Sequence, residues 1–257
     1  LTNDDGIHSE GLWAIAENLA EIAEVTVVVP DRDQSGMGAS MTLLKPLSYE
    51  RVEPRVKGVS SAYTVEGTPA DCVIMATEHI LELEPDLIVS GINQGANLGL
   101  DVFNSGTFGA ALHGYFRGIN SIAVSVLYKD DVIYGPAAAV GAILAKCVFN
   151  TSPDEKLLLN LNLPACPMED IKALDLTKLG PKAFLENVES TQSGRRTFYW
   201  IRHNKPVDDR DLEGTDVWSV SNDRISLTLI DPFLSNLNGG KLADGFASVV
   251  REQLKFT

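Results

Sequence analysis

Side chains with oxygen atoms that could hold a metal ion follow three apolar runs of the sequence. The segments are Asn3-Asp4-Asp5-Gly6, then Asp31-Arg32-Asp33-Gln34-Ser35-Gly36, and then Ser90-Gly91-Ile92-Asn93 with its continuation to Gly99. They offer adjacent carboxylates, a hydroxyl and an amide oxygen without a His or Cys cluster, which suits Mg²⁺ or Mn²⁺ better than Zn²⁺. Because ligands bind beyond the carboxyl ends of strands in an open parallel sheet, we expect the three segments to converge on one site.

A second feature, Ser105-Gly106-Thr107, opens a stretch with helical character. Hydroxyls and free backbone N–H groups at a helix start form an anion site, and a glycine there lets a phosphate approach closely. A cation site beside an anion site indicates phosphoryl chemistry, in which the metal neutralises the phosphate and lowers the pKa of a bound water.

Each motif also has a purely structural interpretation. Asp-Asp-Gly after a strand is most often a turn, Ser-Gly-Thr before a helix is most often a cap, and a glycine-rich loop can simply need positive φ. His8 lies near the acidic pair, but we interpret it as a surface residue, and Trp13 and Cys72 as core residues. Arg195-Arg196 beside an aromatic run could stack a base, yet packing of an aromatic strand is the simpler interpretation.

The elements that would position these residues alternate between strands and helices. The patterns predict helices at 9–24, at 69–83 after a Thr68 cap, and at 107–117. They predict strands at 25–29, 87–89 and 122–126, and further strands and turns within 41–65. Leu1-Thr2 is expected to be the tail of a first strand. This alternation predicts an α/β fold in which a mostly parallel sheet is flanked by helices.

Beyond about residue 180 the pattern changes to antiparallel strands. We expect strands at 197–202, 217–220 and 225–229, with a turn at Asn222-Asp223 joining the last two, and a helix at 242–254. The predicted organisation is therefore a core over residues 1–180 and an extension over 181–257 that serves oligomerisation.

The composition narrows the class of protein. The 257 residues include 21 Lys and Arg against 35 Asp and Glu, a formal net charge of -14, which argues against nucleic-acid or anionic-membrane partners. The best apolar stretch, 136–149, is too short for a membrane span and contains Lys146. Three cysteines without a C-x-x-C spacing, and no visible secretory signal, lead us to expect a cytoplasmic protein.

Taken in order, the motifs resemble those of the SurE family, the survival-protein nucleotidases. They are the three segments above, Gly67-Thr68-Pro69-Ala70-Asp71-Cys72, Asn97-Leu98-Gly99 and Ser105-Gly106-Thr107, followed more loosely by Asn160-Leu161-Asn162-Leu163-Pro164, Leu179-Gly180 and Gly214-Thr215-Asp216. The match is dense up to about residue 126. The chain departs from the family in one segment. The family has a glycine-containing turn followed by Ser-x-Thr-Pro-Leu, whereas this chain has Asn222-Asp223 followed by Ser226-Leu227-Thr228-Leu229-Ile230. This difference leaves the choice between dimer and tetramer open.

The resemblance implies a metal-dependent phosphatase acting on nucleoside 5′- and 3′-monophosphates, and in some members on polyphosphate. It implies one divalent ion per subunit, Mg²⁺ or Mn²⁺, with ligands at Asp4, Asp5, Ser35 and Asn93. Phosphate-contacting positions then fall on Asn97, Ser105, Gly106 and Thr107. It also implies a Rossmann-like core and a C-terminal extension that is exchanged between subunits of a homodimer or homotetramer.

We therefore expect hydrolysis of a phosphomonoester by metal-activated water, with Asp4 or Asp5 orienting the water. Two alternatives from other classes remain open. One is a metal- and nucleotide-binding module without catalysis, and the other is a sugar-nucleotide transferase, for which no acceptor domain is visible. A haloacid-dehalogenase-type phosphatase is disfavoured because Asp4-Asp5-Gly6-Ile7 lacks the D-x-D-x-[TV] spacing.

Overall fold

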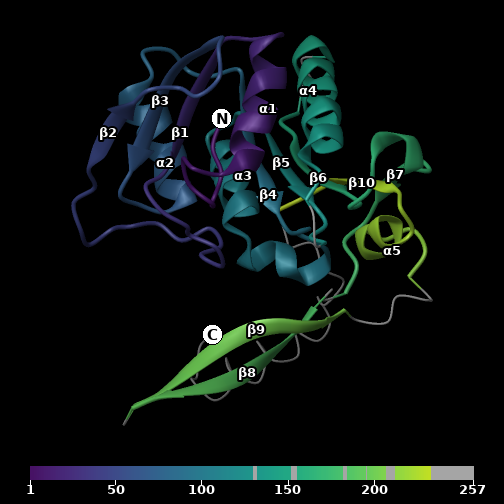
Figure 1. Cartoon of the computed structure of the whole chain (residues 1–257). Helices are drawn as coiled ribbons and strands as arrows, with labels where there is room; N and C mark the ends of the chain where they lie inside the picture. Colours follow the sequence, from purple (N-terminus) through teal and green to yellow (C-terminus); the bar gives the residue numbers. More distant parts are fainter. Residues whose placement is uncertain (130–131, 152–154, 182–183, 195, 207–211, 233–257) are drawn as a thin grey trace, which may run out of the picture.

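The computed structural model describes residues 1–129, 132–151, 155–181, 184–194, 196–206 and 212–232. Five strands form one sheet in the order β4-β5-β6-β10-β7, and three form a second in the order β1-β3-β2. β4, β5 and β6 run parallel, as do β1 and β3, whereas β2 is antiparallel to β3 and β10 is antiparallel to β6. Figure 1 shows helices on both faces of this arrangement, so the predicted α/β fold is confirmed.

The strands have the following bounds: β1 Val25–Pro30, β2 Tyr49–Val52, β3 Val59–Val65, β4 Leu87–Gln94, β5 Asn120–Val126, β6 Leu158–Leu163, β7 Leu174–Thr177, β8 Phe184–Ser193, β9 Arg196–Pro206 and β10 Ile225–Leu229. The helices are α1 Glu10–Ala20, α2 Pro69–Met75, α3 Gly106–Phe116, α4 Tyr134–Thr151 and α5 Asp216–Ser221. Short helical turns complete the list: η1 Ala76–Ile80, η2 Gly99–Asn104 and η3 Met168–Asp170. Each helix and strand predicted before residue 130 is found, with shifted ends.

The first two residues join the two sheets. The backbone N–H of Thr2 donates to Val89 O (2.9 Å) in β4, and the N–H of Val28 in β1 donates to Leu1 O (2.9 Å). Thr2 also pairs with Ser90 as a parallel bridge. Leu1 and Thr2 thus lie between β1 and β4 and form a single bridge there, and the acidic pair follows directly at the carboxyl end of this segment.

The core has two apolar layers because side chains alternate across the central strands. In β5, Ile122 and Val124 belong to the cluster shared with α1 and α4, while Ala123 belongs to the cluster around Phe108 of α3. Trp13 is 6% exposed and Cys72 0%, as expected for core residues. No helix in the described ranges is both long and apolar enough to cross a bilayer.

The region beyond residue 180 differs from its prediction in two elements, since β8 was not predicted and one predicted strand is a helix. Residues 217–220 were expected to form a strand paired with 225–229, but they lie in α5, whose N-terminus is capped by the Thr215 hydroxyl. Asn222-Asp223 is a turn, as expected, but it connects a helix to β10. β10 enters the central sheet between β6 and β7, so the chain returns to the core after the hairpin.

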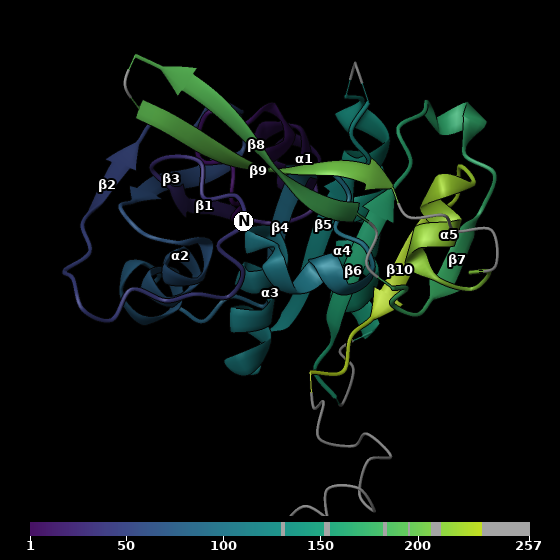
Figure 2. The same cartoon turned by 90° about the horizontal axis from the view of Figure 1, so that it is seen from below.

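The predicted strand at 197–202 lies in β9, and its partner is β8. Figures 1 and 2 show these two strands as a long twisted ribbon that extends away from the sheet. The predicted helix at 242–254 lies outside the described residues.

Candidate active site

A tight turn directly after Leu1 and Thr2 holds the acidic pair, Asp4 and Asp5. The Asn3 side chain accepts a hydrogen bond from Gly6 N (3.1 Å) and donates one to Gly6 O (3.0 Å). Gly6 has φ +84, and a Cβ at this position would lie 3.1 Å from Pro30 O, so glycine suits the turn on both counts. The backbone N–H of Gln34 donates to Asp4 O (2.8 Å), which brings the loop after β1 against the pair.

The start of α3 meets the same carboxylate. The Thr107 hydroxyl donates to Asp4 Oδ1 (2.5 Å), and both side chains are buried. A Cβ on Gly106 would lie 2.8 Å from Asp4 Cβ, so the helix start and the acidic turn are in close contact. The Ser105 hydroxyl oxygen accepts from Phe108 N (3.1 Å) as the helix cap, which leaves its own hydrogen free to donate elsewhere.

The acidic pair has the charge properties of a cation site. Burial raises the pKa of Asp4. Burial, with the nearby charges of Asp4 and Asp33, raises the pKa of Asp5 to about 7. Asp5 Oδ2 is buried, and among the described residues it has no hydrogen-bond partner. A buried carboxylate oxygen without a donor, beside a second carboxylate, fits a divalent cation.

The other two expected ligands have their oxygens available. The Ser35 hydroxyl and backbone N–H both donate to Asp33 Oδ1 (2.6 and 2.7 Å), which leaves the Ser35 oxygen lone pairs unused. The Asn93 amide nitrogen donates to Gly95 O (2.6 Å), which leaves Asn93 Oδ1 as an acceptor. In the described part of the chain no three His, Cys, Asp or Glu residues are placed so that they alone could hold a metal ion, so a metal would need these mixed oxygen ligands.

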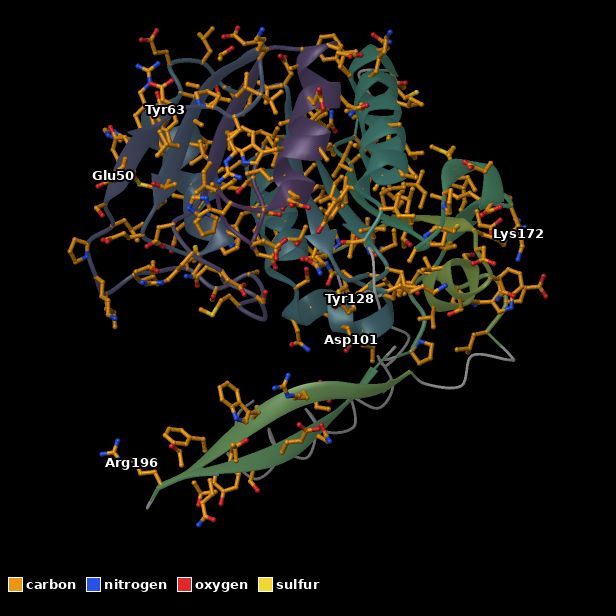
Figure 3. All side chains as sticks on the ribbon, in the orientation of Figure 1. Glu50, Tyr63, Asp101, Tyr128, Lys172 and Arg196 are labelled. Carbon is orange, nitrogen blue, oxygen red and sulfur yellow. The ribbon has the colours of Figure 1, made fainter. Side chains whose placement is uncertain are left out.

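A cleft of about 430 Å³ brings most of the predicted residues together. Its lining includes five of them: Asp4, Ser35, Asn93, Asn97 and Ser105. The other three, Asp5, Gly106 and Thr107, adjoin Asp4 without lining the cleft. Asp101 and Tyr128 also line it, and Figure 3 shows them at the edge of the core that faces the hairpin.

A buried polar network on β5 and β6 fixes the loop that carries Asn97. Asn97 O accepts from the side-chain amides of Asn160 (2.9 Å) and Asn162 (3.1 Å), and Asn97 N donates to Asn162 Oδ1 (2.8 Å). The Asn97 side chain donates to Ser125 Oγ (3.0 Å). The sequence reasoning did not identify these partners as functional residues. A signal was present, because β6 is fully buried and two asparagines alternate with leucine in it, which is unusual for a buried strand.

Asp216 is a second residue whose role the sequence reasoning missed. Its side chain is 0% exposed and accepts three backbone hydrogen bonds, from Gly99 N (2.7 Å), Gly180 N (2.7 Å) and Val217 N (2.8 Å). Burial raises the pKa of this carboxyl against the opposing effect of those donors. Asp216 therefore ties the loop after Asn97 to residue 180 and to the start of α5.

Comparisons with known proteins identify the family of this chain. The family described as survival protein SurE matches residues 1–186. A curated relative from Dehalococcoides mccartyi (strain CBDB1), named 5′-nucleotidase SurE, is 41% identical over 232 residues, 90% of this chain and 87% of its own length. A relative of the same name from Vibrio parahaemolyticus is 38% identical over 231 residues, 89% of this chain and 86% of its own length.

The fold comparison extends the match to nearly the whole chain. The crystal structure of the SurE protein from Aquifex aeolicus has a TM-score of 0.81 and 37% identity, covering 96% of this chain and 98% of that one. With the family match over residues 1–186 and relatives near 40% identity, the chain belongs to the SurE family.

Proposed function

We propose that this protein is a divalent-metal-dependent phosphomonoesterase that hydrolyses nucleoside 5′- and 3′-monophosphates to nucleoside and phosphate, with a possible activity on polyphosphate. The observation that carries the proposal is the acidic pair against the start of α3, in which Asp4 is buried and the buried Asp5 Oδ2 has no hydrogen-bond partner in the described residues. The curated relatives named 5′-nucleotidase SurE support the choice of substrate.

Asp4, Asp5, Ser35 and Asn93 would hold one Mg²⁺ or Mn²⁺ ion per subunit. Such an ion, when bound, lowers the pKa of a bound water and neutralises phosphate charge. The protein contributes the arrangement of the ligands, because the Asn3–Gly6 turn and the Thr107 hydroxyl fix the Asp4 carboxylate. Asp4 or Asp5 would also orient the attacking water and accept its proton.

The phosphate would be bound by Asn97 and by the Ser105, Gly106 and Thr107 turn. Ser105 keeps its hydroxyl hydrogen for donation, and the first backbone N–H groups of α3 have no partner within the helix. The Thr107 hydroxyl is already used by Asp4, so its contribution to phosphate would come from the backbone N–H. Fixed donors of this kind stabilise the charge that builds on phosphoryl oxygens.

We further propose that residues 1–180, joined by α5 and β10 from the later region, form the catalytic core. The rest of the predicted extension over 181–257 would make a homodimer or homotetramer in the cytoplasm, with no nucleic-acid or membrane partner. The β8–β9 hairpin supports the oligomer because it exposes large apolar side chains along its length. Val188 is 65% exposed, Tyr199 70% and Ile201 77%. Patches of this kind mark interfaces between subunits.

The test is phosphate release from a panel of nucleoside monophosphates after chelation and after adding back Mg²⁺, Mn²⁺ or Zn²⁺. We expect release to vanish with chelator and to return with Mg²⁺ or Mn²⁺. Nucleotide binding without release under any of these conditions would instead favour a non-catalytic binding module. Transfer of a sugar from a sugar nucleotide, without monophosphate hydrolysis, would favour the transferase.

A further inference from the structure

We propose that Tyr128 is a specificity-determining residue whose ring stacks against the nucleobase of the substrate. The proposal rests on the proposed function, since it assigns the part of the cleft that the metal and phosphate residues leave unused. It follows from where Tyr128 lies, from the apolar residues Leu127 and Ala96 in the same cleft, and from the exposure of its ring.

The position of Tyr128 is set by the sheet. β5 ends at Val126, which pairs with Gln94 of β4, and Gly95 N donates to Val126 O (2.9 Å). The next residue, Leu127, is held by a hydrogen bond from its N–H to Leu163 O (2.8 Å) at the end of β6. Tyr128 therefore follows a fixed backbone at the carboxyl end of the sheet, and it lines the same cleft as Asn93.

Two apolar residues that line the same cleft as Tyr128 are anchored in the core. Leu127 and Ala96, which also line the cleft, pack against the buried cluster of Leu98, Val217 and Val220. The lining of the cleft thus offers polar side chains, such as Asp4 and Ser105, together with apolar ones at Ala96 and Leu127. A nucleoside monophosphate has the same two parts, because its phosphate is anionic and its base is flat and largely apolar.

The ring of Tyr128 is available to a ligand. The residue is 59% exposed, and among the described residues its ring forms no aromatic pair. An exposed aromatic ring on a fixed wall is the surface on which a base stacks, and stacking tolerates every base because each has a π-face. We therefore expect the enzyme to accept purine and pyrimidine nucleotides alike.

The experiment compares Tyr128→Ala and Tyr128→Phe with the wild type on adenosine and uridine 5′-monophosphate and on ribose 5-phosphate, which lacks a base. Tyr128→Ala should lower kcat/KM for both nucleotides roughly 5- to 100-fold, mainly through KM. For ribose 5-phosphate it should change kcat/KM by less than about twofold, because no stacked base is lost. Tyr128→Phe keeps the ring and should match the wild type on every substrate.

A matched control is Phe116→Ala, which removes an aromatic side chain that is 60% exposed at the far end of α3 and does not line the cleft. It should leave all three substrates unaffected. Equal losses on nucleotides and ribose 5-phosphate in Tyr128→Ala, or no loss on either, would overturn the stacking role.

Failure of the proposed function would look different, since the wild type would then release phosphate from none of the substrates. Calorimetric titration of adenosine, which carries the base but no phosphate to release, into the Mg²⁺-loaded protein tests stacking without turnover. A Kd that is unchanged between the wild type and Tyr128→Ala would overturn the role of Tyr128 in either case.

Discussion

Replacing Gly106 with alanine tests the contact between the start of α3 and the acidic pair. The added Cβ would lie 2.8 Å from Asp4 Cβ and 3.1 Å from Pro69 Cγ, so it must move about 0.6 Å away from Asp4 to reach the 3.4 Å at which ordinary contact begins. Asp4 is 3% exposed and bonded to Thr107 at 2.5 Å, so it has little room to yield.

Catalytic groups tolerate about 0.5 Å of displacement, and a misplacement of about 1 Å can cost about 100-fold in rate. We therefore expect Gly106→Ala to lower kcat/KM for phosphate release by about 10- to 100-fold. The strain should also lower the free energy of unfolding by about 1–3 kcal/mol. Initial rates at saturating Mg²⁺ and urea unfolding curves measure the two effects separately.

The matched control is Gly135→Ala in the first turn of α4, where an added Cβ meets nothing within 4 Å. This variant should keep wild-type kinetics and change the free energy of unfolding by less than about 0.5 kcal/mol, since the position is open and lies in the first turn of the helix. Wild-type kcat/KM in Gly106→Ala would refute the inferred contact between the helix start and the metal ligand.

Three further predictions concern single residues. Asp5→Asn should lower kcat by orders of magnitude and raise the thermal midpoint of the chelated protein, because it removes a partly buried negative charge beside Asp4; near-wild-type turnover at saturating Mg²⁺ would contradict the ligand assignment. Asp216→Ala should lower the free energy of unfolding by about 3 kcal/mol in urea titrations, since three buried N–H groups lose their acceptor; a change under about 1 kcal/mol would contradict this. Burial lowers the pKa of His113 below its ordinary 6.5, so the folded state binds fewer protons and stability should fall as pH drops through about 6.5. The urea midpoint should fall between about pH 7.5 and pH 5.5 in the wild type, and it should fall less in His113→Gln. An equal fall in the two proteins would contradict the role of His113.

The strand-helix alternation was enough to predict the core up to about residue 126, because each of those elements spans several turns or a clear apolar run. Residues 217–220 were assigned wrongly because four residues cannot separate a period of 2 from a period of 3.6. Val217 and Val220 are three apart and pack together against Leu98, which is helical spacing. The Thr215 cap was the local signal for a helix start.

The site could be predicted in outline from the same sequence. The rule that ligands bind at the carboxyl ends of parallel strands indicated that the segments with Asp4, Ser35 and Asn93 would converge, and they line one cleft. The partners of Asn97 could not be predicted, because Asn162 lies 65 residues further along the chain and its contact depends on the order of strands in the sheet. The pairing of β10 with β6 and β7 could not be predicted for the same reason.

The insertion of β10 between β6 and β7 has a consequence for how the chain folds. Until residues 225–229 are synthesised, β6 has an unpaired edge and β7 has no neighbour in the sheet. Contacts between such distant parts of a chain slow folding, and an open edge strand invites pairing with other chains. A nascent or truncated chain that lacks β10 should therefore be the species that recruits chaperones or aggregates, whereas the completed chain closes that edge itself.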